Sequence, residues 1–310
     1  MSNHRCLVAI LCPARLQLMS ALPPIQRVPS PSWPFIFFHL RKTGGSSFRP
    51  VVAMAADELN LTFFVPCLEQ RHRNTVNRIG LSGSHMASCN QYYLGALVAR
   101  EENLARTSVF AGHFYWDATA LASRSVMVPS TTQLTTPFSC FIMVREPVAR
   151  FQSCYTERIQ PTIRRPLEKL PLSQLYDILA NFTERGTALQ QGCNNEIARW
   201  ISPDMAWGDT HANRGELSQM AVDETKRRLG LCTVGDISGR TNDTRRVLRH
   251  WHPWLARYYG GVNSGHRSDH IAPTMLPSAT VAAIRQANAL DLDLYAFAMA
   301  HFEMMLEHID

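Results

Sequence analysis

Three short motifs combine residue types that can act on an anion. The first is HLRKTGGSSF, from His39 to Phe48, in which an apolar run leads into a glycine pair and then a helical pattern. Such a turn directs backbone N–H groups and the positive end of a helix at one point, and glycines let an anion approach the main chain. Lys42 adds a charge, and hydroxyl groups add donors. The residues predicted to bind the anion are Arg41, Lys42, Thr43, Gly44, Gly45, Ser46 and Ser47.

This motif is not a Walker A loop. In that loop a glycine stands directly before the lysine, whereas Lys42 precedes both glycines here. A serine-capped structural turn at a helix start is the alternative interpretation. The lysine and three hydroxyl groups in one turn favour the anion site.

The second motif is VFAGHFYWD, from Val109 to Asp117, which ends an apolar strand and presents His113. A histidine titrates near neutrality and can take a proton from an attacking hydroxyl group, so His113 is the candidate general base. A structural histidine is the alternative. For Tyr115, Trp116 and Asp117 we weigh an acceptor site against packing, and packing is favoured.

The third motif is FIMVREPVARFQSCYTE, from Phe141 to Glu157, a buried strand followed by a helix that starts at a proline. Arg145 stands at the strand end, and Ser153 follows about two helical turns later. The two side chains are predicted to clamp one phosphate. An arginine paired with Glu146 or Glu157 is the alternative.

The pattern of short apolar runs and longer helical stretches predicts an α/β three-layer sandwich with a central, mostly parallel sheet. Residues 1–33 form a Pro-rich leader that is predicted to be disordered, and residues 34–310 form one domain. The predicted strands are Phe35–Leu40, Thr62–Pro66, Ser108–Ala111, Phe138–Val144 and Leu231–Val234. The predicted helices are Ser46–Glu58, Pro147–Glu157, Leu172–Phe182, Gly215–Leu229, Asp243–Tyr258 and Ala279–Glu307. Ligands of open α/β sheets bind beyond the carboxyl ends of the strands, where all three motifs fall.

The strand followed by KTGG and serine resembles the 5′-phosphosulfate loop of the Golgi carbohydrate sulfotransferases, particularly the uronosyl and heparan sulfate 2-O-sulfotransferase group. Gly112-His113 matches the family's Gly-His, and its histidine is the proposed base. Arg145 and Ser153 match the two ligands of the family's 3′-phosphate. The family has proline before the lysine and threonine after the second glycine, where this chain has Arg41 and Ser46.

The resemblance spans Phe35 to Glu307 and implies a P-loop nucleotide-hydrolase-like sulfotransferase fold. It implies 3′-phosphoadenosine 5′-phosphosulfate (PAPS) as sulfate donor, no metal, and a place in the Golgi lumen or membrane. Arg150 and Tyr155 also fit, as scaffold, and Arg267 falls in a loop that related enzymes fold over the nucleotide.

Composition narrows the class of partner. The net charge is +6, and nearly all of the basic residues are arginines, because Lys42, Lys169 and Lys226 are the only lysines. Arginine suits contact with sulfate, phosphate and carboxylate. Nothing beyond charge indicates binding to nucleic acid.

Eight cysteines without metal-ligand spacing make a zinc site improbable and permit disulfides. Sequons at Asn60, Asn181 and Asn242 suit a lumenal protein. The apolar run Cys6–Cys12 is too short for a spanning helix, and no convincing signal peptide or anchor is visible.

The sequence therefore predicts sulfuryl transfer from PAPS to a hydroxyl group of an acidic or neutral glycan, with Lys42 and His113 as catalytic residues. A membrane anchor missing from this chain is possible, and the oligomeric state is open. One alternative is a magnesium-dependent kinase-like enzyme, which needs an acidic residue after a second strand. The other is a non-catalytic protein that binds a glycan or nucleotide.

Overall fold

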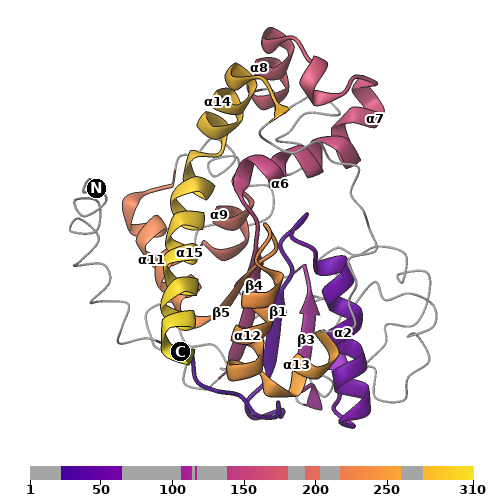
Figure 1. Cartoon of the computed structure of the whole chain (residues 1–310), viewed down its shortest axis with the longest axis vertical. Helices are drawn as coiled ribbons and strands as arrows, with labels where there is room; N and C mark the ends of the chain where they lie inside the picture. The colour runs from indigo at the N-terminus through magenta and orange to yellow at the C-terminus, as the bar shows by residue number, and fades with distance from the viewer. Residues whose placement is uncertain are drawn as a thin grey trace.

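Five parallel strands form the centre of the molecule, as Figure 1 shows for a computed structural model that describes residues 22–64, 106–113, 116, 138–180, 193–202, 217–259 and 275–310. The strand order is β2-β3-β1-β4-β5, and every pair is parallel. The strands are β1 (Phe35–Phe38), β2 (Phe63–Phe64), β3 (Val109–Gly112), β4 (Ser139–Val144) and β5 (Thr233–Asp236). The predicted α/β class and parallel sheet are confirmed.

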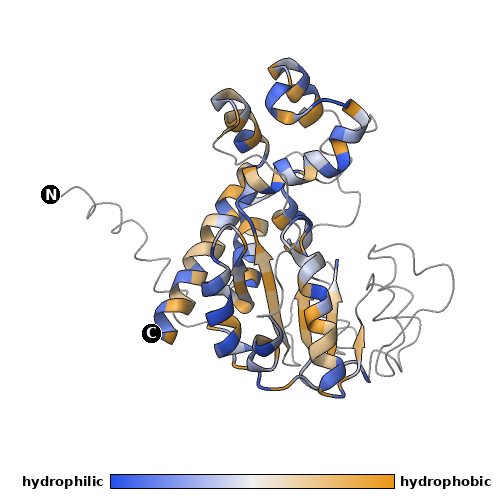
Figure 2. Ribbon diagram, turned by 45° about the vertical axis from the view of Figure 1, so that its right-hand side comes forward, coloured by the Kyte–Doolittle hydropathy of each residue, from blue (hydrophilic) through white to orange (hydrophobic). Residues whose placement is uncertain are grey.

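Helices cover both faces of this sheet, which makes three layers. The side chains of Phe35 and Phe37 pack toward α2 (Gly45–Glu58) and α13 (Pro253–Tyr259). Those of Ile36 and Phe38 pack on the other face, because side chains alternate along a strand. The helices there are α9 (Glu196–Ile201), α11 (Gln219–Leu231) and α15 (Ala289–Ile309), while α12 (Thr241–Trp251) contributes to both cores. The strands are accordingly hydrophobic on both faces (Figure 2).

A separate group of helices stands beyond the carboxyl ends of the strands, at the top of Figure 1. It has its own core, built around Phe151, Tyr155 and Ile284. Its members are α6 (Pro147–Cys154), the π-helical turn η3 (Tyr155–Ile159), α7 (Gln160–Ile163), the 3₁₀ turn η4 (Leu167–Lys169), α8 (Leu172–Ala180) and α14 (Ser278–Ala287). Helix α6 follows β4 directly, with Pro147 at its first position and the Glu146 carboxylate accepting from the Ala149 N–H at 2.8 Å.

Two of the predicted helices are wrong in their continuity. The predicted helix Asp243–Tyr258 is interrupted at His252, and Pro253 opens α13. The predicted helix Ala279–Glu307 is interrupted at Asn288, which separates α14 from α15. Proline lacks the N–H that would continue the first helix. At the second break, the Asn288 side chain donates to the Ile284 carbonyl at 2.9 Å and so bonds the backbone locally.

Residues 22–33 belong to the predicted leader, yet they contact the domain. The Trp251 indole N–H donates to the Pro23 carbonyl at 2.8 Å, and the Gln26 N–H donates to the Trp251 carbonyl at 2.9 Å. The rest of the predicted leader lies outside the described residues. None of the described helices is both long and apolar enough to cross a membrane.

Candidate anion-binding site

The three predicted motifs meet at one end of the sheet. Strand β1 lies between β3 and β4, so the loops that carry Lys42, His113 and Arg145 leave three adjacent strands at their carboxyl ends. From β1 the chain continues toward β2 on one side, and from β4 it continues toward β5 on the other. Ligands bind at such a switch in open α/β sheets. The topology thus brings together the loops in which the sequence predicts chemistry.

The first loop is fixed by its backbone and by Arg145. Lys42 and Gly44 both adopt left-handed conformations, with φ of 63° and 79°. Among the described side chains none caps the start of α2 at Gly44, so the N–H groups of its first turn are left without a side-chain partner there. The Arg145 guanidinium donates to the Lys42 carbonyl at 3.3 Å, which ties the third motif to the first.

Two predicted ligands of this loop have internal roles. The Thr43 hydroxyl group is buried and donates to the Leu40 carbonyl at 2.7 Å, so this side chain closes the turn. At Gly45 an added Cβ would lie 1.8 Å from the His39 ring. The absence of a side chain at Gly45 thus makes room for the His39 ring, and the contact of Gly45 with an anion stays a prediction. The Ser47 N–H donates to the Gly44 carbonyl at 3.0 Å, and the Ser46 side chain lies outside the described part.

His113 is held in one tautomer. Its Nδ1 lies 2.7 Å from the His39 carbonyl oxygen, and a carbonyl can only accept, so Nδ1 carries the proton in the neutral ring. Nε2 is then the unprotonated nitrogen. The His39 ring stacks on the His113 ring with centroids 4.1 Å apart. The centroid of the Trp200 ring lies 5.9 Å from that of the His113 ring. This arrangement orients a nitrogen that can accept a proton, as the prediction of a general base requires.

Burial and positive charge keep both histidines neutral. Burial lowers the pKa of His113 to about 3, with further lowering by Arg49, Arg41 and Arg158 and a partial opposing effect of the His39 carbonyl. The pKa of His39 is also well below its usual value, first through burial and then through His113 and Arg49. An anion bound beside these arginines would cancel part of their field and raise the pKa of His113 toward the range useful for a base.

Arg145 and Ser153 differ in accessibility. Arg145 is half-buried, and its pKa is lowered by burial and by Arg150. Ser153 lies on α6 with 2% of its surface exposed, so a phosphate would reach it only after its neighbours move. Their joint grip on one phosphate stays a prediction.

Arg150 and Tyr155 serve the scaffold, as the sequence indicates. The Arg150 guanidinium is buried and donates to Glu196 at 2.8 Å and to Asn288 at 3.4 Å. The Tyr155 hydroxyl group donates to the Arg165 carbonyl at 2.7 Å. Trp116 also packs, with its ring 5.3 Å from that of Phe38.

Four further residues contribute to the site, although the sequence places none of them among the anion-binding or catalytic residues. Arg49 on α2 is almost fully buried and acts on both histidine rings, and His39 supplies the carbonyl and the stack. The Glu157 carboxylate pairs with the Lys42 ammonium group. The Glu196 carboxylate accepts from the Arg41 N–H at 2.5 Å, with 155 residues between the partners, so no spacing in the sequence indicates it.

Other predicted contributors lie outside the described residues, namely Tyr115, Asp117 and Arg267. In the described ranges no group of three or more His, Cys, Asp or Glu side chains could hold a metal ion.

Scans against protein-family models and against curated proteins find no match to this chain. The site therefore rests on its own geometry: cations follow β1 and β4, and a neutral, oriented imidazole follows β3.

Proposed function

We propose that this chain transfers a sulfuryl group from PAPS to a hydroxyl group of a carbohydrate, on a P-loop-like sulfotransferase fold. The observation that carries the proposal is the meeting of Lys42, His113 and Arg145 at adjacent strand ends, with His113 held in the tautomer that leaves Nε2 unprotonated. A transferase of this kind needs cations for the donor and a base for the acceptor, and this end of the sheet offers both.

The basic residues fit a donor with two anionic ends. PAPS supplies an activated sulfuryl group on its 5′-phosphate and carries a second phosphate at the 3′ position. The first-turn amides of α2 and Lys42 are suited to the 5′ end, and Arg145 to the 3′ end. The bond from Arg145 to the Lys42 carbonyl keeps these two subsites in a fixed relation.

In the proposed reaction each residue has one task. His113 takes the hydroxyl proton on Nε2 while the bond from the acceptor oxygen to sulfur forms and the bond from sulfur to the 5′-phosphate oxygen breaks. Lys42 and the α2 amides stabilise the negative charge that appears on that phosphate oxygen. Lys42 must first leave Glu157, and since both side chains are partly exposed, at 22% and 54%, this exchange is inexpensive.

Cysteine pairing supports an oxidising compartment such as the Golgi lumen. Cys140 is bonded to Cys232 and Cys154 to Cys193, and such bonds persist where glutathione does not reduce them. The sequon residues Asn60 and Asn242 are both exposed, so each could carry a glycan.

The test is transfer of label from [³⁵S]PAPS to heparan, chondroitin and neutral glycans in the presence of EDTA. We expect label in at least one glycan with the wild-type protein and strongly reduced transfer, by about 10²-fold or more, with Lys42→Ala or His113→Ala. Undiminished transfer in both variants would refute the mechanism. Binding of adenosine 3′,5′-bisphosphate without any transfer would instead support the non-catalytic alternative.

One observation favours the kinase-like alternative. Asp236 ends β5 and is an acidic residue after a second strand, which a magnesium-dependent enzyme needs. Asp236 accepts from the Ser238 N–H at 3.0 Å, and burial raises its pKa, so it is already part of a turn. Phosphate transfer from ATP that EDTA abolishes would establish this alternative.

A further inference from the structure

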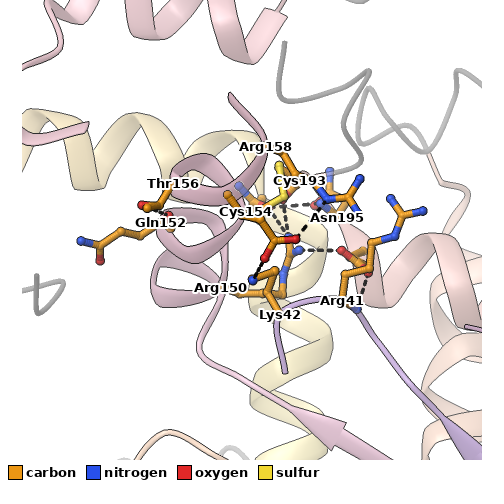
Figure 3. The surroundings of a disulfide bond; sticks show 12 residues. Arg41, Lys42, Arg150, Gln152, Cys154, Thr156, Arg158, Cys193 and Asn195 are labelled. Atoms are coloured by element: carbon orange, nitrogen blue, oxygen red, sulfur yellow. Dashed lines mark hydrogen bonds and ion pairs between the residues drawn. A yellow bond between two sulfur atoms is a disulfide. The ribbon is translucent and has the colours of Figure 1, made fainter. Parts of the chain in front are cut away.

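The Cys154–Cys193 disulfide lies beside the loop after β1 that carries Arg41 and Lys42, here called the donor loop (Figure 3). The disulfide joins two segments that both contact this loop. Cys154 is the last residue of α6, and Cys193 precedes α9. Each cysteine is followed three residues later by a glutamate, Glu157 in one segment and Glu196 in the other. These glutamates contact consecutive residues of the loop, Lys42 and Arg41.

The contact through Glu196 is buried and directed at the backbone. Its carboxylate is fully buried, accepts from the Arg41 N–H at 2.5 Å, and accepts from Arg150 at 2.8 Å. Arg150 also donates to the Cys193 carbonyl. A buried carboxylate with both partners in place holds the backbone firmly, because losing either partner leaves an unpaired buried charge.

The contact through Glu157 is exposed and directed at a side chain. Glu157 stands in the π-helical turn η3, which begins at the residue after Cys154. Its carboxylate pairs with the ammonium group of Lys42 and has 54% of its side-chain surface exposed. An exposed pair of this kind contributes little and is readily exchanged for another anion.

We propose that the Cys154–Cys193 disulfide is a positioning element of the donor site. It holds Glu196 where it fixes the backbone at Arg41, and it holds Glu157 where it retains Lys42 until an anionic donor displaces it. Glu196 therefore favours donor binding, whereas Glu157 competes with it. This inference rests on the proposed function for the identity of the anion, and on the described contacts for the geometry.

The second disulfide provides a matched control. Cys140 lies near the start of β4, and Cys232 directly precedes β5, so this bond fastens the amino ends of the strands, away from the loop. It closes 92 residues of chain, whereas Cys154–Cys193 closes 39. Since a longer closed loop restricts the unfolded chain more, loss of Cys140–Cys232 should cost more stability. Its loss should nevertheless cost less donor affinity.

The experiment measures calorimetric affinity for adenosine 3′,5′-bisphosphate and thermal unfolding in six proteins: wild type, Cys154→Ala/Cys193→Ala, Cys140→Ala/Cys232→Ala, Glu196→Gln, Glu157→Gln and Glu58→Gln. We expect about tenfold weaker binding in Cys154→Ala/Cys193→Ala and in Glu196→Gln, equivalent to one hydrogen bond to a charged group. Cys140→Ala/Cys232→Ala should bind as wild type with a lower melting temperature.

Glu157→Gln gives the most discriminating test, because a purely structural role of Glu157 would predict weaker binding, whereas competition with the donor predicts tighter binding. Its affinity should rise about threefold, as removal of a competing surface carboxylate allows. Glu58→Gln is the control, since Glu58 is 58% exposed and also pairs with a basic residue, Arg257, at 2.9 Å. Its affinity should equal that of the wild type. Weaker binding in Glu157→Gln, or equal losses for the two disulfides, overturns the proposal.

Hydrogen exchange of the loop separates this inference from the proposed function. The Arg41 amide should exchange faster in Glu196→Gln and in Cys154→Ala/Cys193→Ala than in the wild type or in Cys140→Ala/Cys232→Ala. If the wild type binds no adenosine 3′,5′-bisphosphate but this exchange pattern holds, the donor assignment fails and the positioning role stands. If Glu196→Gln and Cys154→Ala/Cys193→Ala are folded and the Arg41 amide exchanges in both as it does in the wild type, the positioning role is contradicted.

Discussion

Each end of the parallel sheet holds a histidine whose pKa is lowered first by burial, but only the histidine at the carboxyl end is also affected by arginines. At the amino end His252 is buried, its Nε2 lies 2.9 Å from the Thr233 hydroxyl group, and burial alone lowers its pKa to about 3. At the carboxyl end burial likewise lowers the pKa of His113 to about 3, and Arg49, Arg41 and Arg158 lower it further. A bound anion can offset the arginines but cannot reverse burial. An anion bound at the carboxyl end should therefore raise the pKa of His113 and leave that of His252 unchanged.

The largest expected effect is the fall in transfer rate when His113 is replaced. We expect His113→Ala to lower transfer from PAPS by about 10³-fold, within the usual range for a general base, while the protein stays folded. His250→Ala, on the partly exposed surface of α12, should leave the rate unchanged. Steady-state rates of labelled transfer measure both. A similar loss in the two variants would remove the distinction between the sheet ends.

The charge on Lys42 should matter slightly less. We expect Lys42→Ala to reduce the transfer rate by about 10²-fold, as for one donor to a developing charge. Lys226→Ala is matched to it, because Lys226 is 25% exposed and pairs with the carboxylate of Asp293 at 2.7 Å. This control should transfer label at the wild-type rate, and a loss comparable to that of Lys42→Ala would show that ion pairing alone explains both.

Gly45 should be intolerant of a side chain because His39 fills the space beside it. The Cβ of Gly45→Ala would lie 1.8 Å from the imidazole, so the ring must move away from His113. We expect about 1–3 kcal/mol lower stability in urea unfolding, the usual cost of overpacking. Gly44→Asn should cost less, because asparagine tolerates the left-handed backbone there. Equal costs would argue against the His39 contact.

Acidification should destabilise the protein through both sheet ends. The folded pKa of about 3 for His113 and for His252 lies below the unfolded value near 6.5. Between these values the unfolded chain binds protons that the folded chain does not. The stability these residues contribute is therefore complete above pH 6.5 and lost as pH falls, by up to about 1.4 kcal/mol per pH unit for each ring.

Urea unfolding between pH 7 and 4 can separate the two contributions. His113→Asn and His252→Asn should each reduce the slope of stability against pH. Saturating adenosine 3′,5′-bisphosphate should flatten the slope of the wild type, because it raises the pKa of His113, and should leave that of His113→Asn unaltered. A bound anion that flattens both would contradict the assignment to His113.

The approximate positions of the strands could be predicted because an apolar run is a local signal, although Leu231, predicted to begin the last strand, ends α11, and β5 runs from Thr233 to Asp236. A continuous apolar run marks β4, and the polar residues that follow it include Arg145. The break at His252 also had a local signal in Pro253. The break at Asn288 did not, because its side chain also accepts from the Asn195 N–H at 3.1 Å, across 93 residues.

The supporting contacts of the site were beyond the sequence for the same reason. Lys42 and Glu157 are 115 residues apart, and only the fold makes them partners. Arg41 is a further example, because the sulfotransferases that the sequence resembles have proline at this position. A proline has no N–H to donate, so the bond from Arg41 to Glu196 gives a physical reason for this departure.

Titration of adenosine 3′,5′-bisphosphate into the wild type, Lys42→Ala, Arg145→Ala and His113→Ala tests the central claim most directly. We predict that the wild type binds, that Lys42→Ala and Arg145→Ala each bind at least about tenfold more weakly, and that His113→Ala binds nearly as the wild type does. No binding by the wild type, or equal weakening in all three variants, would contradict a donor site at the carboxyl end of the sheet with His113 reserved for the acceptor.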